Sequence, residues 1–167
     1  MVEVSASKNW SPSDETRLHD FSCPDYLMSR IKKKGILDDD ERIIGAFEEW
    51  KKYVNLCMSN RSKRIPMVSK LIDEMWHHFI LFTREYHDFS SDILGIQYFH
   101  HAPTTKEHDS SQDKIEFFID AYTEKYGEIP ADYWGSVDEI YCCKTCNFDC
   151  SGRCSEGCAP TSDCGSK

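Results

Sequence analysis

The segment PMVSKLIDEMWHHFILFTREYHDF, residues 66–89, carries the strongest helical pattern in the sequence. With successive side chains about 100° apart, one broad arc is apolar and holds Val68, Ile72, Met75, Phe79, Phe82 and Tyr86. So wide an apolar arc predicts the central helix of the fold. A narrower sector holds three polar residues, Asp73, His77 and Arg84.

Three shorter helices are predicted before this segment. The first begins at Pro12, with Ser11 as its N-cap, and reaches Phe21. The second runs from Pro24 to Lys34 and is closed by Gly35. The acidic residues 38–41 open the third, and its apolar stripe ends at Cys57, which we interpret as a small buried hydrophobe.

Beyond the central segment, residues 90–111 are loop-like and contain a His100-His101 pair. A loop of this length inside a domain is uncommon unless it is functional. A fifth helix begins near Ser111 and stops at Gly127, and residues 129–134 form an aromatic closing segment. No stretch alternates with period two. The predicted fold is all-α, a compact bundle of about five helices.

Composition sets the organisation and excludes some functions. The 167 residues predict a flexible lead (1–11), a helical domain (12–141) and a Cys-rich, largely irregular tail (142–167). With 40% hydrophobic and 13% aromatic residues the chain is not disordered as a whole, and a net charge of -9 argues against binding to duplex nucleic acid. Without a membrane-length apolar run or a signal sequence, we expect a cytoplasmic protein that does not engage membranes.

A metal site is the sharpest chemical prediction. Asp73 and His77 lie four residues apart on one helix face, and zinc or non-haem iron accepts such ligands. A third ligand must come from the loop, where His100 and His101 are the candidates. Adjacent residues of an extended loop point to opposite sides, so only one of them reaches the ion, and we favour His101.

A network without metal explains the same residues. In that alternative a buried His77 is held by Asp73 while the loop histidines pack on Trp76. His78 and His87 are interpreted as surface histidines.

Seven of the nine cysteines lie between Cys142 and Cys164. Cys143 and Cys146 form a two-residue-spaced pair, which Cys150 and Cys154 would complete as a zinc site. A flexible metal–thiolate tail and disulfides or unliganded thiols are the alternatives.

The stretch DEMWHHFILFTREYHDF, followed by Gly95 and FHHAP, resembles the signature of the glycine-rich domain-containing protein family of plants, bacteria and fungi. The pattern joins nine residues over roughly residues 65–105: Asp73, Trp76, His77, Thr83, Tyr86, Gly95, His100, His101 and Pro103. Members often carry Cys at the position of Ser90, and a Cys- and Gly-rich C-terminus is common in bacterial relatives. The resemblance implies no particular reaction.

Three functions remain open from the sequence. The first is a metal-binding interaction module, with zinc or alternatively iron as cofactor and a protein partner for the tail. The second is a metal-dependent enzyme with an open position at Asp73, His77 and His101, assisted by Glu74 or Tyr86. The third is a scaffold with an interaction tail. Phosphate loops, nucleophile elbows and dinucleotide fingerprints are absent, and Cys23 is a poor nucleophile candidate.

Overall fold

The computed structural model describes residues 9–101, 112–137 and 140, and these confirm the all-α fold. They form seven α-helices and one π-helical turn, rather than about five helices. The elements in order are α1 (Pro12–His19), α2 (Asp25–Lys33), α3 (Asp40–Ser59), α4 (Lys70–Ile80), α5 (Thr83–Asp88), η1 (Phe89–Ile93), α6 (Gln112–Tyr126) and α7 (Ala131–Trp134). No described helix has the length and apolar character needed to cross a membrane.

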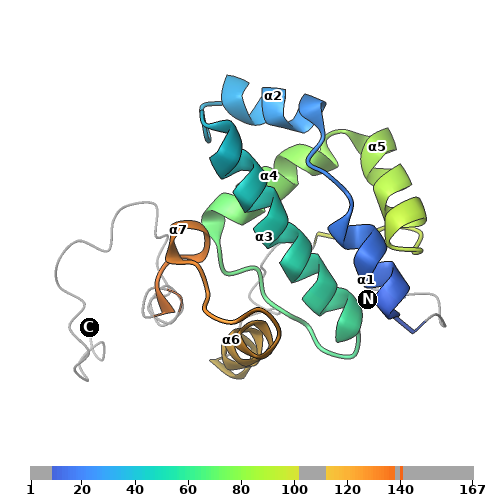
Figure 1. Cartoon of the computed structure of the whole chain (residues 1–167), viewed down its shortest axis with the longest axis vertical. Helices are drawn as coiled ribbons and strands as arrows, with labels where there is room; N and C mark the ends of the chain where they lie inside the picture. Colours follow the sequence, from blue (N-terminus) through green and yellow to red (C-terminus); the bar gives the residue numbers. More distant parts are fainter. Residues whose placement is uncertain (1–8, 102–111, 138–139, 141–167) are drawn as a thin grey trace, which may run out of the picture.

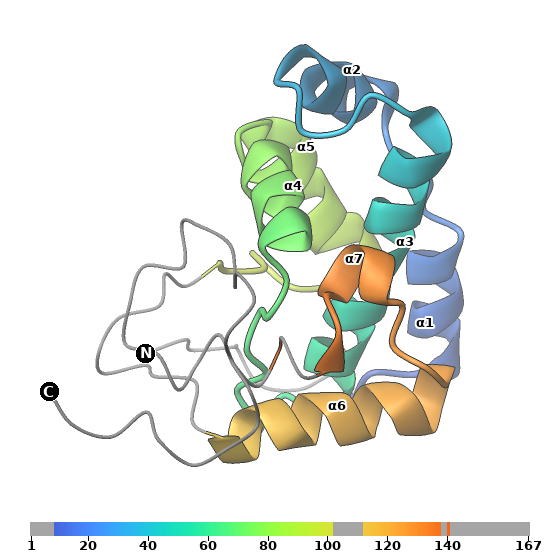
Figure 2. The ribbon, with the colours of Figure 1, turned by 90° about the vertical axis from the view of Figure 1, so that its left-hand side faces the viewer.

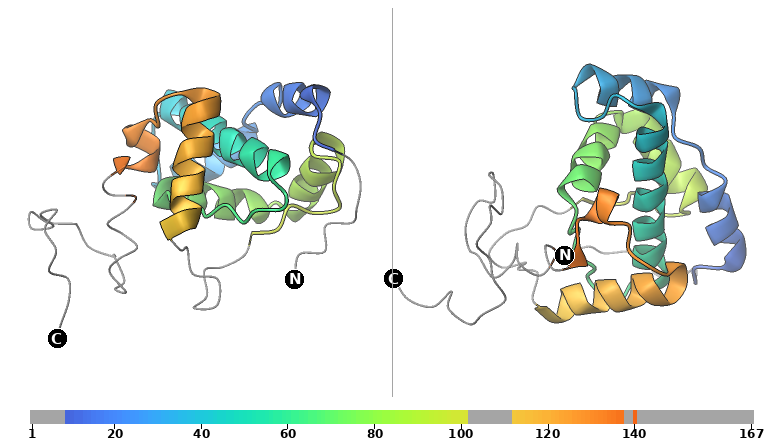
Figure 3. Two further views of the ribbon diagram at one scale, coloured as in Figure 1. Left: turned by 90° about the horizontal axis from the view of Figure 1, so that it is seen from below. Right: turned by 60° about the vertical axis from the view of Figure 1, so that its left-hand side comes forward.

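Helix α3 is the axis around which the other helices are arranged (Figure 1). Helix α4 packs along it, α2 lies at one end of the bundle, and α6 crosses the other end (Figure 2). Helices α1 and α7 lie on opposite sides of α3 (Figure 3). The centre is aromatic, because Trp50 of α3 contacts the rings of Phe47, Trp76, Phe79 and Phe89 at centroid distances of 5.2–6.2 Å.

The predicted starts and stops of the outer helices are confirmed. Ser11 caps α1 in a capping box with Asp14, because each side chain accepts a hydrogen bond from the other's backbone N–H. Two glycines end helices with positive φ, Gly35 at 69° and Gly127 at 84°. This left-handed conformation is cheap only for glycine.

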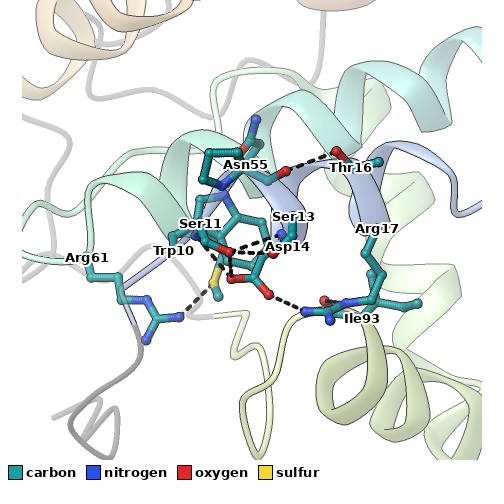
Figure 4. A network of polar contacts seen from close by, with 11 residues as sticks. Trp10, Ser11, Ser13, Asp14, Thr16, Arg17, Asn55, Arg61 and Ile93 are labelled. Atoms are coloured by element: carbon teal, nitrogen blue, oxygen red, sulfur yellow. Dashed lines mark hydrogen bonds and ion pairs between the residues drawn. The ribbon is translucent and has the colours of Figure 1, made fainter.

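Trp10 and helix α1 are bonded to two other elements (Figure 4). The Arg17 guanidinium pairs with Asp14 and donates from Nε to the carbonyl oxygen of Ile93, at 2.9 Å. Trp10 donates from Nε1 to Oδ1 of Asn55 in α3, at 2.6 Å. Helix α1 is thereby bonded to η1, and Trp10 just before it to α3; η1 precedes the segment that leads to His101.

The prediction of one continuous central helix over residues 66–89 is wrong. Helix α4 begins only after its N-cap, Ser69, and ends at Ile80, and α5 begins at Thr83. Leu81, 60% exposed, lies at the break. On a straight helix Phe79 and Tyr86 would lie about 10 Å apart along the axis. In the broken arrangement their ring centroids lie 5.2 Å apart, edge to face. The two helices therefore pack on each other through these aromatic rings.

A buried carboxylate joins three helices that are distant in sequence. Glu49 of α3 is 5% exposed, and its Oε2 accepts hydrogen bonds from Tyr122 Oη of α6 at 2.5 Å and Trp134 Nε1 of α7 at 2.7 Å. Lys52 Nζ pairs with Oε1 at 2.7 Å. Because its charge has three partners, Glu49 can be buried, and it fixes the predicted closing segment against the bundle.

Candidate metal centre

One cluster of three metal-ligand residue types exists in the described part of the chain: Asp73, His77 and His101. One ligand atom from each side chain lies within 4.8 Å of the other two. Asp73 and His77 stand one turn apart on α4, and His101 arrives from the loop. The structure therefore brings together the helical pair and the loop histidine that the sequence analysis favoured.

The closest contact joins His101 to Asp73. Nε2 of His101 lies 2.6 Å from Oδ1 of Asp73, the distance of a short hydrogen bond. When the carboxyl group is ionised it only accepts, so Nε2 carries the shared hydrogen. The loop is thus attached to α4 through an interaction between an imidazole and a carboxylate.

The ring of His77 is oriented by its own helix. Its Nδ1 lies 2.7 Å from the backbone carbonyl oxygen of Asp73 and 3.4 Å from Asp73 Oδ2. A carbonyl oxygen has no hydrogen to give, so Nδ1–H is the donor and the neutral ring carries its lone pair at Nε2. Backbone carbonyls fix the tautomer of metal-ligating histidines in this way.

Burial within the cluster is uneven. The His101 side chain is 14% exposed, whereas those of Asp73 and His77 are 34% and 55% exposed. His101 packs edge-on against Trp76 at a centroid distance of 4.4 Å and lies 4.2 Å from the His77 ring. The alternative network had expected a buried His77. The structure corrects the burial of His77, which is exposed, whereas the expected packing of a loop histidine on Trp76 is confirmed for His101.

The spacing of the ligand atoms can be compared with that around a metal. A tetrahedral ion with bonds of about 2.0–2.2 Å holds neighbouring ligand atoms about 3.3 Å apart. His77 Nδ1 lies 3.4 Å from Asp73 Oδ2, but this nitrogen carries the hydrogen bonded to the carbonyl oxygen of Asp73, so the atom of His77 that would bind an ion is Nε2. The 2.6 Å between His101 and Asp73 is shorter by about 0.7 Å, the difference between sharing a hydrogen and sharing an ion.

The other loop histidine, His100, does not join the cluster. Its ring faces Tyr98 at 5.0 Å, and the residue lines a separate cavity of about 120 Å³ that also includes Cys57 and Phe99. The predicted role of His100 as a metal ligand is therefore not supported by its position. The alternation of side chains in an extended segment explains why His100 and His101 diverge.

Three further residues singled out in the sequence lie outside the cluster. Arg84 stands exposed on α5, separated from α4 by the helix break. Glu74 is exposed, next to Asp73. Tyr86 is fully buried, and burial raises the pKa of its hydroxyl, which is engaged with Trp76 and Phe99. Tyr86 is therefore not placed to act as an acid or base.

The pairing of His78 with α2 was not predicted from the sequence. Arg30 donates from Nε to Nδ1 of His78 at 3.1 Å. Desolvation, followed by the nearby Arg30 charge, lowers the pKa of His78. No local signal reveals this contact, because 48 residues separate its partners.

The two cysteines of the helical domain are poor nucleophiles. Desolvation raises the pKa of both Cys23 and Cys57 to about 12, and Cys57 lies partly buried against the core as predicted. Cys143, Cys146, Cys150 and Cys154 lie outside the described residues.

Fold and site together define a small all-helical protein with an Asp/His/His cluster between its central helix and a loop. Residues 13–126 match the model of the UCP032817-like family, which is over half of the chain, so the protein belongs to that family. The resemblance to the glycine-rich domain-containing family is accordingly wrong. It rested on about forty residues around the cluster, whereas the family match covers the bundle from α1 to α6. No curated protein and no solved structure matches the chain.

Proposed function

We propose that the protein binds a transition metal ion, zinc first and iron as the alternative, through Asp73, His77 and His101. The single observation that carries the proposal is the convergence of these three side chains, with ligand atoms within 4.8 Å, from two segments 28 residues apart. Two imidazoles and one carboxylate make up the ligand set of many catalytic zinc and non-haem iron sites.

An ion that binds the cluster competes with a proton for the same ligand atoms. The hydrogen between His101 and Asp73 must leave the Nε2–Oδ1 contact before a cation takes its place. Binding of the ion is therefore accompanied by release of that hydrogen. The His77 ring needs no such release. Its Nδ1–H is bonded to the carbonyl oxygen of Asp73, and its lone pair is at Nε2.

The experiment uses full-length chain in which the seven tail cysteines are replaced by serine, so that only the cluster can bind one equivalent. Elemental analysis after zinc loading and dialysis should give close to one ion per chain. His77→Ala and His101→Ala should each reduce this to a small fraction. His87→Ala is the matched control, because His87 is an exposed histidine on α5. Wild-type-like zinc content in the two cluster variants would overturn the proposal.

The exposure of His77 supports a second candidate, a metal-dependent enzyme. Three protein ligands leave a fourth position of a tetrahedral ion for water or substrate. Cobalt-loaded protein reports such a position, because azide shifts the visible spectrum only when it reaches the ion. An unchanged spectrum at saturating azide would leave the binding module as the proposal, with the tail as its contact to a protein partner.

A further inference from the structure

We infer that Ser90 and Tyr86 are positioning residues for the metal site, because they set the backbone from which His101 reaches Asp73. This inference rests on the proposed function for its consequence in metal binding. Its geometrical part concerns the metal-free protein and can be tested separately. Neither residue touches the cluster, and both act through Phe99, two residues before His101.

Ser90 holds the loop at two points. It is fully buried within the π-helical turn η1, where its hydroxyl donates to the carbonyl oxygen of Tyr86 at 2.9 Å. The same hydroxyl accepts from the backbone N–H of Phe99 at 3.2 Å. The Ser90 carbonyl oxygen accepts from the backbone N–H of Ile96 at 3.0 Å. One residue thus fixes both ends of the segment 96–99.

Tyr86 binds the backbone carbonyl group of Phe99, whose N–H is bonded to Ser90. Its hydroxyl donates to the carbonyl oxygen of Phe99 at 2.5 Å and accepts from Nε1 of Trp76 at 2.9 Å. Trp76 in turn stacks on the Phe99 ring at 5.3 Å and meets His101 edge-on at 4.4 Å. Both backbone polar groups of Phe99 are therefore bonded to side chains of the helical region.

The arrangement has a consequence for the ligand set. Asp73 and His77 share one helix and need no loop to come together, whereas His101 depends on the path of residues 96–101. A backbone group buried without a partner is costly, so the chain adopts the path that satisfies both groups of Phe99. Ser90 and Tyr86 thus select the loop conformation in which His101 contacts the carboxylate, in the manner of the outer groups that orient metal ligands.

The experiment compares Ser90→Ala and Tyr86→Phe with Ser91→Ala in the full-length chain. Ser91 is the matched control, because its hydroxyl bonds only to Asp88 and Asp92 in the same turn. In the metal-free protein, the imidazole nitrogen NMR signals of His101 should shift in both test variants and stay in place in Ser91→Ala. The signals of His77 should change little in all three.

Zinc titration supplies the second measurement. Outer groups of this kind typically change metal affinity by about 10–100-fold, so both test variants should weaken binding by that factor. When the chain already carries His101→Ala, adding Ser90→Ala should cause no further loss of zinc affinity. A substitution that only destabilised the fold would weaken binding in this background as well.

The outcomes test the metal site and the positioning role of Ser90 and Tyr86 separately. If wild-type protein binds no zinc at the cluster, the proposed function fails, and the His101 signals still decide the positioning claim. If zinc binds but Ser90→Ala and Tyr86→Phe leave both the His101 signals and the affinity unchanged, the positioning claim is wrong while the metal site stands. An equal loss of affinity with and without His101 would also overturn it.

Discussion

Nε2 of His101 lies 2.6 Å from Oδ1 of Asp73 across 28 residues of sequence, and the imidazole is four-fifths or more buried while the carboxylate remains reachable from solvent. The two histidines of the cluster therefore differ in what they contribute to stability. His77 projects from the helix surface, whereas His101 fastens the loop to α4. Mutation separates these roles.

His101→Ala should lower the free energy of unfolding of the metal-free protein by about 1–3 kcal/mol, because it removes a part-buried hydrogen bond together with packing on Trp76. His77→Ala should cost clearly less, since its side chain is 55% exposed. Urea denaturation of both variants in the presence of a chelator makes the comparison. Equal costs would show that His77 has a structural role that its exposure does not suggest.

Glu49→Ala should be among the most destabilising single changes in the chain, at about 3–5 kcal/mol. Its removal leaves the hydroxyl of Tyr122 and the indole N–H of Trp134 without their acceptor in a buried junction. Thermal unfolding followed by circular dichroism measures the effect. Glu124→Ala, an exposed carboxylate on α6, serves as control and should fall within about 0.5 kcal/mol of the wild type.

Gly45→Ala should destabilise the protein although Gly45 lies within α3, where alanine is normally the better helix former. A Cβ atom there would lie 2.0 Å from Oη and 2.7 Å from Cζ of Tyr133. Displacing that ring should cost about 1–3 kcal/mol. In a Tyr133→Ala background the same substitution should be neutral or stabilising, and a denaturant-based double-mutant cycle tests this.

Cys23 and Cys57 should react slowly with iodoacetamide at pH 8 in the folded protein and rapidly in urea. Desolvation raises the pKa of both thiols from 9.0 to about 12, so almost no thiolate forms at pH 8. The stability contributed by keeping these thiols neutral is present below pH 9 and is lost as the pH rises towards 12. Peptide mass spectrometry resolves each site. Fast labelling of Cys57 in the folded state would contradict its burial.

Deleting residues 142–167 should leave helicity and melting temperature nearly unchanged. The family match ends at residue 126, and the described core is closed by Trp134 and Ile140. Circular dichroism of the shortened chain tests the boundary at residue 141. Unfolding or aggregation would show that the helical domain needs the segment beyond it.

Local signals in the sequence predict much of this architecture. Ser11 with Pro12, Gly35 and Gly127 mark helix ends through their own backbone chemistry, and the structure places the ends there within one or two residues. The alternation of an extended segment predicted that only one of His100 and His101 reaches the helical pair. These signals act through the backbone geometry of the residues themselves or of their immediate neighbours.

Features that depend on residues far apart in the sequence were not predicted. Leu81 and Phe82 fit the apolar pattern of one long helix, and only the packing of Tyr86 against Phe79 reveals why the helix breaks. Glu49 has a lysine three residues later and resembles an ordinary surface pair. Its burial depends on Trp134, 85 residues further along the chain.

That separation has a consequence for synthesis from the N-terminus. While the ribosome has not yet released Tyr122 and Trp134, Glu49 has only Lys52 as a partner, and the face of α3 destined for α6 and α7 lacks its cover. Burying the carboxylate at that stage would carry the cost of an incompletely paired charge. The nascent chain therefore completes the partners of Glu49, and the cover over this face of α3, only after Trp134 has been made.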